Sequence, residues 1–324
     1  MESPAIRFDP NPTLGALQIG VLISCLLFGL TTMQTYIYYT RFPDDPRMLK
    51  ALVAFVWSCE LALVVCSADT LYRYTILDYG HPERLLQRTP SSLEAAVFFC
   101  GIIAASVQSF FSHRIYSLSK TLYIPLLTWI LSFLRLLAST TAFVSGLLMV
   151  NFVSYEAQWG WLGISLWSVS TANDFIIAGT LVFFLIRQRR NAQKTTAAVV
   201  DRLIAWTIET GMATSAFGIA TLICYLTMAG NFIWIGLFIV GARLFSNSLL
   251  ASLNSRVTLR ALSEASLSHS TPVINFSTPP SSNIDRLSLT EMLRSTQWDD
   301  ERRQWDVLTS AIKDTSGAMK DVST

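Results

Sequence analysis

Residues 13–39 read TLGALQIGVLISCLLFGLTTMQTYIYY, a run of 27 residues without a charged side chain. Lipid offers no hydrogen bonds to backbone amides, so an apolar run of this length is expected to form a helix across the bilayer core, which takes about 20 residues. The run has no basic segment before it and no clear small-residue cleavage site, and it is longer than the apolar part of a signal peptide. We therefore expect it to remain as the first membrane helix.

Six further runs resemble the first in length and apolarity, and short polar loops separate them. Hydrophobic residues make up 52% of the 324 residues and charged residues only 14%, which lies well outside the range of soluble domains. We predict an all-α integral membrane protein, a seven-transmembrane-helix bundle with the topology of a receptor. The predicted spans are 13–39, 48–72, 92–116, 122–149, 161–186, 203–228 and 232–253.

The chain divides by composition into three parts. A short N-terminal segment covers residues 1–12, the seven-helix transmembrane domain covers 13–254, and a polar tail covers 255–324. The tail is rich in Ser and Thr and is interrupted by Thr-Pro pairs, so we expect it to be mostly disordered. Residues 285–313 mix apolar and charged side chains that do not share one face, so we expect no stable amphipathic helix there.

Basic residues in the loops predict the orientation, because Lys and Arg are retained on the cytoplasmic side. The first, third and fifth loops contain ten of them, whereas the second, fourth and sixth contain three. We therefore expect an extracellular N-terminus and a cytoplasmic tail, in the plasma membrane rather than in internal membranes. The basic loop at residues 187–202 and the tail are then the candidate contact sites for a cytoplasmic partner.

Catalytic and cofactor patterns are missing from the sequence. The last span contains no lysine, which retinal proteins need for a Schiff base, and the three histidines lie far apart on separate loops or borders. No serine lies in a nucleophile-elbow pattern with a histidine at usable depth. The net charge of +2 is spread over loops where topology explains it, so nucleic acid is not an expected partner. We expect no enzyme activity, no cofactor and no metal site.

Charged residues near the middle of a membrane cost roughly 2.5–3.5 kcal/mol each, so each needs a partner or a function. Two asparagines of the last span, Asn247 and Asn254, fall within roughly 40° of Arg243 at about 100° per residue, which predicts one inward polar stripe. Asp69 and Glu94 lie nearer the outer ends, where we expect them to reach water. The candidate site comprises Asn247 and Asn254 together with five charged residues at depth, Glu60, Arg135, Asp174, Glu209 and Arg243.

Pairing is the simplest arrangement for the two arginines among these residues, because a guanidinium does not give up its proton. We expect Arg243 to pair with Asp174 or Glu209. Two arginines against three acids leave one carboxyl group, which is either protonated or faces a water-filled cavity. Two interpretations remain open for the whole set: an ion-pair network that fixes helix packing, and a site for a ligand or a proton.

Five segments resemble an uncharacterised family of seven-helix membrane proteins from basidiomycete fungi, of the type called domain of unknown function 6534. The resemblance spans roughly residues 13–260 and implies a seven-helix membrane fold without an assigned activity. The segments are QTYIYYTRFPDD at 34–45, VQSFFSHRIYSLS at 107–119, NDFIIA at 173–178, DRLIAWTIETGMATS at 201–215 and FSNSLLASLNSR at 245–256.

Three functions fit these observations. The first is a receptor-like sensor, in which an unidentified small ligand drives a helix rearrangement around buried ion pairs, although the usual receptor signatures, such as Asn-Pro-x-x-Tyr in the last span, are missing. The second is a proton-coupled transporter that uses the unpaired acid, against which the odd number of helices weighs. The third is a membrane scaffold or interaction protein without a ligand.

Overall fold

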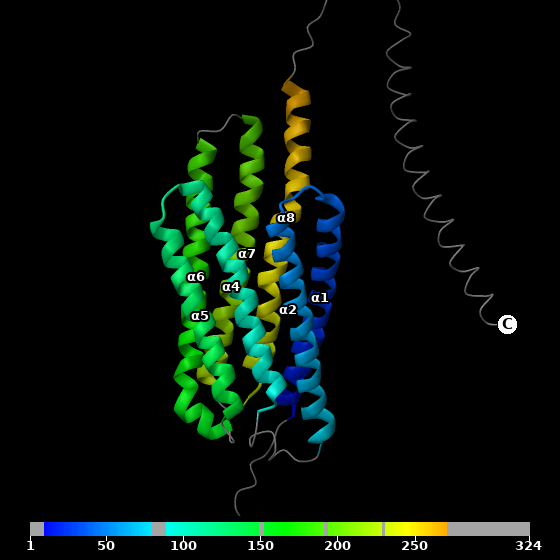
Figure 1. Cartoon of the computed structure of the whole chain (residues 1–324), viewed down its shortest axis with the longest axis vertical. Coiled ribbons are helices and arrows are strands. Elements are labelled where there is room, and N and C mark those ends of the chain that lie inside the picture. The colour runs from blue at the N-terminus through cyan, green and yellow to red at the C-terminus, as the bar shows by residue number, and fades with distance from the viewer. Residues whose placement is uncertain (1–9, 80–88, 149–151, 191–193, 229–230, 271–324) are drawn as a thin grey trace, which may run out of the picture. The chain divides into compact units, whose positions relative to one another are not determined.

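The computed structural model describes residues 10–79, 89–148, 152–190, 194–228 and 231–270. Helices account for nearly all of this backbone (Figure 1). Two five-residue π-helical turns, η1 (Asn11–Gly15) and η2 (Arg73–Leu77), precede the first helix and follow the second. The helices are α1 (Ala16–Arg41), α2 (Arg47–Tyr72), α4 (Ser91–Ser119), α5 (Tyr123–Leu148), α6 (Phe152–Arg190), α7 (Lys194–Thr227) and α8 (Ile233–Ser270).

The prediction of seven spans is confirmed within the described residues, where seven helices are long and apolar enough to cross a membrane. Their outer faces carry large apolar side chains, such as Leu26 at 73% exposure and Val65 at 61%. A soluble protein rarely exposes contiguous apolar surface on this scale, whereas lipid accommodates it. These features are those of a multi-pass membrane protein.

Local signals set several helix ends. Pro46 and Pro90 have extended backbones immediately before α2 and α4, which suits proline because it has no amide hydrogen to donate within a helix. Lys120 has a left-handed backbone with φ 56° and donates its backbone N–H to the carbonyl of Tyr116, so it ends α4.

Three helices continue beyond the spans predicted from apolarity. Helix α6 begins at Phe152 rather than at residue 161, and α7 begins at Lys194 rather than at 203. Helix α8 ends at Ser270, so residues 255–270 of the predicted tail are helical, and residues 271–324 lie outside the described residues. Apolarity marks the part of a helix that crosses the membrane, while polar helix formers continue the backbone beyond it.

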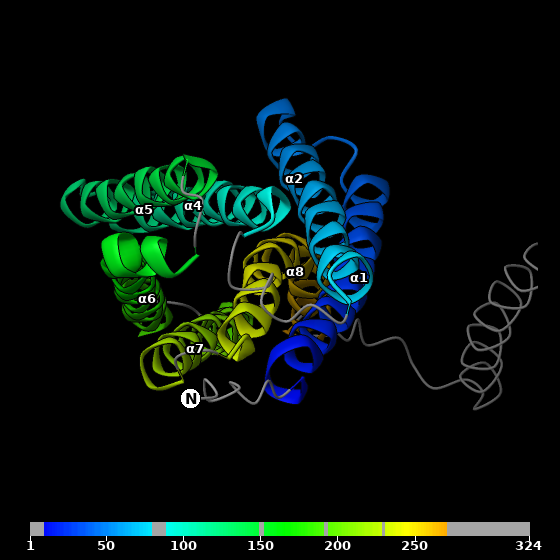
Figure 2. The same cartoon turned by 90° about the horizontal axis from the view of Figure 1, so that it is seen from below.

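Helix α8 lies inside an arc formed by the other six helices (Figure 2). It packs against α1, α2, α4 and α7, while α5 and α6 complete the arc on the side of α4 and α7. In the most apolar 18-residue segment of α8, 67% of the residues are buried, against 11% in the corresponding segment of α7. The main hydrophobic core is therefore centred on α8, around fully buried side chains such as Ile239 and Leu249.

The bundle has two ends, which we name after the prolines beside them. At the Pro46 end α1 is followed by α2, and at the Pro90 end α4 begins. Helices α1 and α8 both start at the Pro90 end, where the Phe232 backbone N–H donates to the carbonyl of Pro12 at 3.1 Å. They run parallel and nearly touch at Gly20 and Gly236, where a Cβ on Gly20 would lie 2.6 Å from the Gly236 Cα.

Candidate functional site

An ion pair between Glu60 of α2 and Arg243 of α8 lies in the middle of the bundle, and both side chains have 0% exposure. The guanidinium donates from Nη1 to a carboxylate oxygen of Glu60 and, at 2.9 Å, to its backbone carbonyl. Its Nε donates to the Ser24 hydroxyl of α1 at 2.7 Å, and the Ser246 hydroxyl donates to the other carboxylate oxygen. The cluster joins three helices and satisfies most of the polar atoms it buries.

This pairing corrects the prediction that Arg243 binds Asp174 or Glu209. Depth along a helix can be read from the sequence, but the identity of the neighbouring helix cannot. Helix α2 packs directly against α8, and it presents Glu60 at the depth of Arg243.

The polar stripe of α8 lies against α1. The Asn247 amide donates to its own-helix carbonyl at Arg243 (2.9 Å) and to the Leu27 carbonyl of α1 at 3.5 Å. The Asn254 amide donates to the Gln34 carbonyl at 2.9 Å. Both asparagines are only partly buried. The stripe therefore fixes the register between two parallel helices, and no described contact connects it to Asp174.

Asp174 of α6 belongs to a second network, in which its partners are uncharged side chains. The Gln108 amide of α4 donates to its carboxylate at 2.8 Å, and the Ser132 hydroxyl of α5 donates to the Gln108 side-chain oxygen at 3.1 Å. The neighbouring Asn173 amide donates to Ser132 at 2.9 Å. This network connects α4, α5 and α6. Gln108, which is 2% exposed, was not among the predicted site residues because a lone amide in a span gives only a weak sequence signal.

Arg135 of α5 is 4% exposed and lies within 4 Å of no acidic side chain among the described residues. Its Nε and Nη1 have no hydrogen-bond acceptor there, and its guanidinium carbon lies 4.9 Å from the centre of the Phe245 ring. The prediction that both buried arginines are paired is therefore wrong for Arg135. An unpaired guanidinium at this depth needs a polar occupant beside it.

Glu209 does not belong to the interior. Helix α7 turns Thr207, Thr210 and Thr214 toward α4 and α6, and this rotation leaves Glu209 exposed on the outer face. Arg202, two turns earlier in α7, is also exposed and lies over the Trp206 ring at 5.1 Å. The prediction of a buried carboxylate at Glu209 is therefore wrong, since the polar face of α7 consists of threonines.

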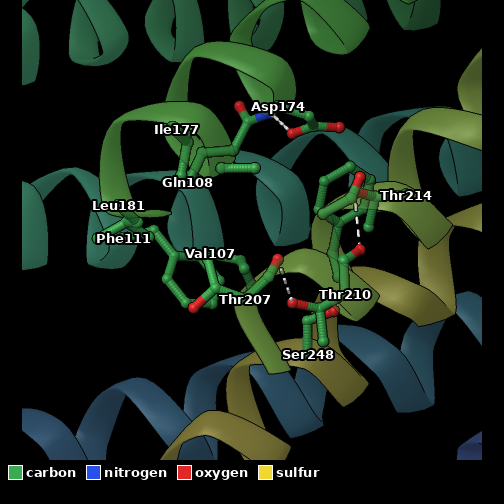
Figure 3. Close-up of a pocket in the computed structure, with 13 residues that line it drawn as sticks. Val107, Gln108, Phe111, Asp174, Ile177, Leu181, Thr207, Thr210, Thr214 and Ser248 are labelled. Atoms are coloured by element: carbon green, nitrogen blue, oxygen red, sulfur yellow. Dashed lines mark hydrogen bonds between the residues drawn. The ribbon is translucent and has the colours of Figure 1, made fainter. Parts of the chain in front are cut away.

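Three cavities follow one another along α6. The aromatic cavity, at the Pro90 end, has a volume of about 80 Å³ and is lined by Glu94 and a group of aromatic side chains. The Arg135 cavity, of about 30 Å³, lies deeper and contains Arg135 and Asp174 in its wall. The threonine cavity, of about 40 Å³, is shown in Figure 3, where the Gln108 amide contacts Asp174 at one side of the space and Thr207 and Thr210 border another.

Single layers of side chains separate neighbouring cavities. Trp167 and Phe238 line both the aromatic and the Arg135 cavity, and Asp174 and Phe245 line both the Arg135 and the threonine cavity. The Arg135 cavity is large enough for water, which needs about 10–15 Å³ on this measure. Arg135 and Asp174 thus share one small polar space without forming a direct ion pair.

Glu94 is a site residue that the sequence analysis did not identify. We expected it to reach water near a helix end, but it is only 6% exposed and lines the aromatic cavity. Gly146 of α5 makes room for it, because a Cβ at Gly146 would collide with the Glu94 carboxylate. The sequence alone does not show that Gly146 lies opposite Glu94, because this contact depends on how α4 packs against α5.

A second ion pair lies at the Pro46 end, between Arg256 at the end of the seventh span and Asp45 in the loop before α2. The Arg256 guanidinium donates to both carboxylate oxygens of Asp45, at 2.5 and 3.2 Å, and holds the pKa of that carboxyl below its ordinary value of 3.8. The Tyr38 hydroxyl adds a hydrogen bond at 3.0 Å. Arg256 also lies 4.2 Å from the centre of the Phe42 ring. These contacts tie α8 to the first loop.

Residues 170–258 match the model of a family described as "Family of unknown function (DUF6534)". The match contains three of the five segments on which the predicted resemblance rests, those at 173–178, 201–215 and 245–256. No curated protein matches the chain. Asp174 and the polar stripe of α8 lie inside the matched region, whereas Glu60, Glu94 and Arg135 lie before it.

Proposed function

We propose that the protein is a receptor-like sensor in the plasma membrane, with the Pro90 end outside and the Pro46 end in the cytoplasm. A small ligand enters the bundle at the Pro90 end and changes how α6, α7 and α8 pack. The loop charges, ten basic residues against three, support this orientation. The basic residues around 187–202 and the tail are then placed to contact a cytoplasmic partner, and the protein carries out no catalytic step.

The main support is the position of the aromatic cavity. It lies at the Pro90 end between α4, α6, α7 and α8, and one layer of side chains, Trp167 and Phe238, separates it from Arg135 and Asp174. Trp167 packs edge-on against Tyr225, Trp234 and Phe238, with centroid distances of 4.9–6.4 Å. An occupant that displaces Trp167 must therefore also move α7 and α8.

In this proposal, the Arg135 cavity is the element that switches between two arrangements. Nε and Nη1 of Arg135 have no acceptor among the described residues, and Asp174 in the same wall has an amide partner but no described ion pair. In this proposal, a shift of Trp167 or Phe245 brings the two charges together or admits water between them. A ligand that favours one of these arrangements shifts the population toward it.

A filled cavity tests this proposal without a known ligand. Gly163 lines the aromatic cavity, and a side chain there would first meet Trp167 at 3.5 Å and Tyr225 at 3.8 Å. We expect Gly163→Leu to mimic an occupant and to alter the Pro46 end by helix shifts of about 1–2 Å. A trifluoromethylphenylalanine reporter at the exposed position of Gln188 in α6, read by fluorine NMR in nanodiscs, measures this change.

Gly29→Leu is the matched control, because no atom lies within 4 Å of a Cβ at Gly29. A new or shifted fluorine resonance in Gly163→Leu but not in Gly29→Leu supports the sensor. Identical spectra for wild type and Gly163→Leu would contradict it, because the cavity would then have no connection to the Pro46 end.

The series of three cavities favours a second candidate, a proton-coupled transporter. The cavities extend along α6 from Glu94 near one end to the level of Leu181 toward the other, and Asp174 lies between the second and the third. Proteoliposomes loaded with a pH-sensitive dye distinguish this candidate from the sensor. Proton entry that is lost in Asp174→Asn supports transport, and impermeable liposomes support the sensor.

A further inference from the structure

One described residue in the wall of the aromatic cavity carries a charge, Glu94, and its carboxylate lies against Gly146 of α5. The carboxylate accepts a hydrogen bond from the Thr89 hydroxyl, and among the described residues it has no ion pair. Among the described residues, no Lys, Arg or His belongs to the cavity wall. A carboxylate that is only 6% exposed and has no cation beside it among the described residues carries a large desolvation cost. An occupant with a positive charge would offset that cost.

Aromatic rings make up much of the remaining wall. Trp159, Trp167, Tyr225, Trp234 and Phe238 line the space, and Leu93 and Ile235 are among the aliphatic residues that complete it. The face of an aromatic ring is electron-rich and attracts an organic cation, most strongly where water is excluded. Such rings combined with one carboxylate form the chemistry of an ammonium-binding cage.

Inorganic cations fit this wall poorly. Ca²⁺ takes six to eight oxygen ligands, and Mg²⁺ six, whereas the wall offers one carboxylate and the hydroxyls of Thr89 and Tyr225. No group of three or more His, Cys, Asp or Glu side chains in the described part of the chain is suited to a metal ion. An uncharged apolar group would occupy the space but leave the carboxylate without a cation among the described residues.

The size of the cavity limits the cation further. Its volume of about 80 Å³ exceeds the roughly 10–15 Å³ that one water needs, so it holds a group of several non-hydrogen atoms. The indole N–H groups of Trp159 and Trp167 have no acceptor among the described residues. A ligand oxygen close to the charge would satisfy these donors.

We propose that the aromatic cavity binds a small organic cation, an alkylammonium group that contacts Glu94 and the surrounding ring faces and carries an oxygen within a few bonds. This inference rests on the proposed sensor in one respect, since the cation would then be its ligand. The binding site itself requires no signalling.

Choline and its neutral isostere 3,3-dimethylbutan-1-ol provide the test, because they differ in charge but hardly in shape. The full-length protein is reconstituted in nanodiscs, and binding is measured by calorimetry and by the rise of the unfolding midpoint. We expect saturable binding of choline and none of the isostere. Glu94→Gln should weaken choline binding by about tenfold or more, which corresponds to about 1.4 kcal/mol.

Glu209→Gln is the matched control, since it makes the same chemical change at an exposed carboxylate on α7. It should bind choline like the wild type. Gly146→Ala is a second variant, because its Cβ would displace the Glu94 carboxylate while leaving the charge in place, and it should also weaken binding. Unfolding midpoints without ligand show whether each variant is folded.

Equal binding of choline and the isostere would overturn the proposal, as would choline binding that survives Glu94→Gln unchanged or the absence of saturable choline and tetramethylammonium binding at millimolar concentrations. The two proposals fail separately. Choline binding without any change at the Gln188 reporter supports the cation site and contradicts the sensor. A response of the reporter to Gly163→Leu without choline binding supports the sensor and contradicts the cation site.

Discussion

The ion pair between Glu60 and Arg243 shows how single residues hold this bundle together. Each of the two charges would be costly alone in an apolar interior, and each is surrounded by donors or acceptors from a different helix. The attraction between the two charges adds little to the free energy of unfolding. The larger effect is that separating α2 from α8 inside the bundle would leave two buried charges without partners. Removing one partner should be much more harmful than removing both.

A double-mutant cycle tests this reasoning. Arg243→Leu leaves the Glu60 carboxylate buried without a cation, so the free energy of unfolding should fall by about 3–5 kcal/mol. Adding Glu60→Gln in the same molecule should restore part of the loss, because the glutamine is neutral and can still accept from Ser246. Unfolding midpoints in detergent measure both. Asp174→Asn combined with Arg243→Leu serves as the control, and strict additivity of the Glu60 and Arg243 changes would refute the pairing.

The Asp45–Arg256 pair predicts a pH effect. The folded carboxyl has a pKa below its ordinary value of 3.8, so the unfolded chain binds its proton at a higher pH than the folded chain does. The pair therefore stabilises the fold fully above the ordinary value, and this stabilisation is lost as the pH falls through the lower folded pKa. Thermal unfolding of wild type and Asp45→Asn should differ at neutral pH and converge at acidic pH. A constant difference across this range would argue against the pair.

The burial of the charged residues could be predicted from the sequence more reliably than their partners. Glu60, Arg135, Asp174 and Arg243 are buried as predicted, because charge within an apolar run is visible in the sequence. Their partners were not predictable, since they depend on which helices are neighbours and how each is rotated. Glu209 shows the second limit, because a rotation of α7 about its own axis is enough to place it outside.

At the scale of helices, the parallel contact of α1 and α8 depends on small residues. Their hydrogen bonds join residues at a nearly constant separation in sequence, 219 for Ser24 and Arg243 and 220 for Gln34 and Asn254, which is the register of two parallel helices. Gly20 and Gly236 allow the backbones to approach closely, as small residues do between membrane helices. The close contact in turn brings Ser24 within reach of Arg243.

Two glycines of α1 provide a matched pair of substitutions. Gly20→Ala would place a Cβ 2.6 Å from the Gly236 Cα and should destabilise the protein by about 1–3 kcal/mol, because the helices must move apart. Gly29→Ala meets no atom within 4 Å and should be neutral or stabilising by up to about 1 kcal/mol, since alanine favours the helix. Chemical denaturation in mixed micelles measures both. The same effect for both variants would contradict a tight crossing at Gly20.

The sequence predicted the membrane-spanning segments more accurately than the ends of the helices. The predicted spans agree with the apolar segments of the structure to within a few residues, because both depend on the same property. The ends of α6, α7 and α8 were missed, since a helical backbone continues as long as no residue interrupts it. The contact of Gly146 with Glu94 depends on three-dimensional packing alone.

For the whole molecule, the central position of α8 connects the stabilising contacts with the candidate site. Helix α8 supplies Arg243 to the ion pair, Phe245 to Arg135, and Trp234 and Phe238 to the aromatic cavity. Any occupant of the cavity therefore acts on the helix that also carries the Arg256 contact at the Pro46 end. The direction in which such a signal crosses the membrane depends on the orientation of the bundle.

Glycosylation mapping tests that orientation in cells. The first, third and fifth loops, with ten basic residues, follow the helix ends that meet at the Pro46 end, so this end should face the cytoplasm. An acceptor tripeptide in a flexible N-terminal extension should then be glycosylated. The sequence Asn275-Phe276-Ser277 in the tail matches the acceptor pattern Asn-x-Ser/Thr, and Asn275 should remain unmodified. Treatment with a glycosidase, followed by a gel shift, provides the readout. Glycan on Asn275 and none on the extension would reverse the orientation. The aromatic cavity would then face the cytoplasm, and its organic cation would have to come from inside the cell, so the protein could not sense an external ligand through this site.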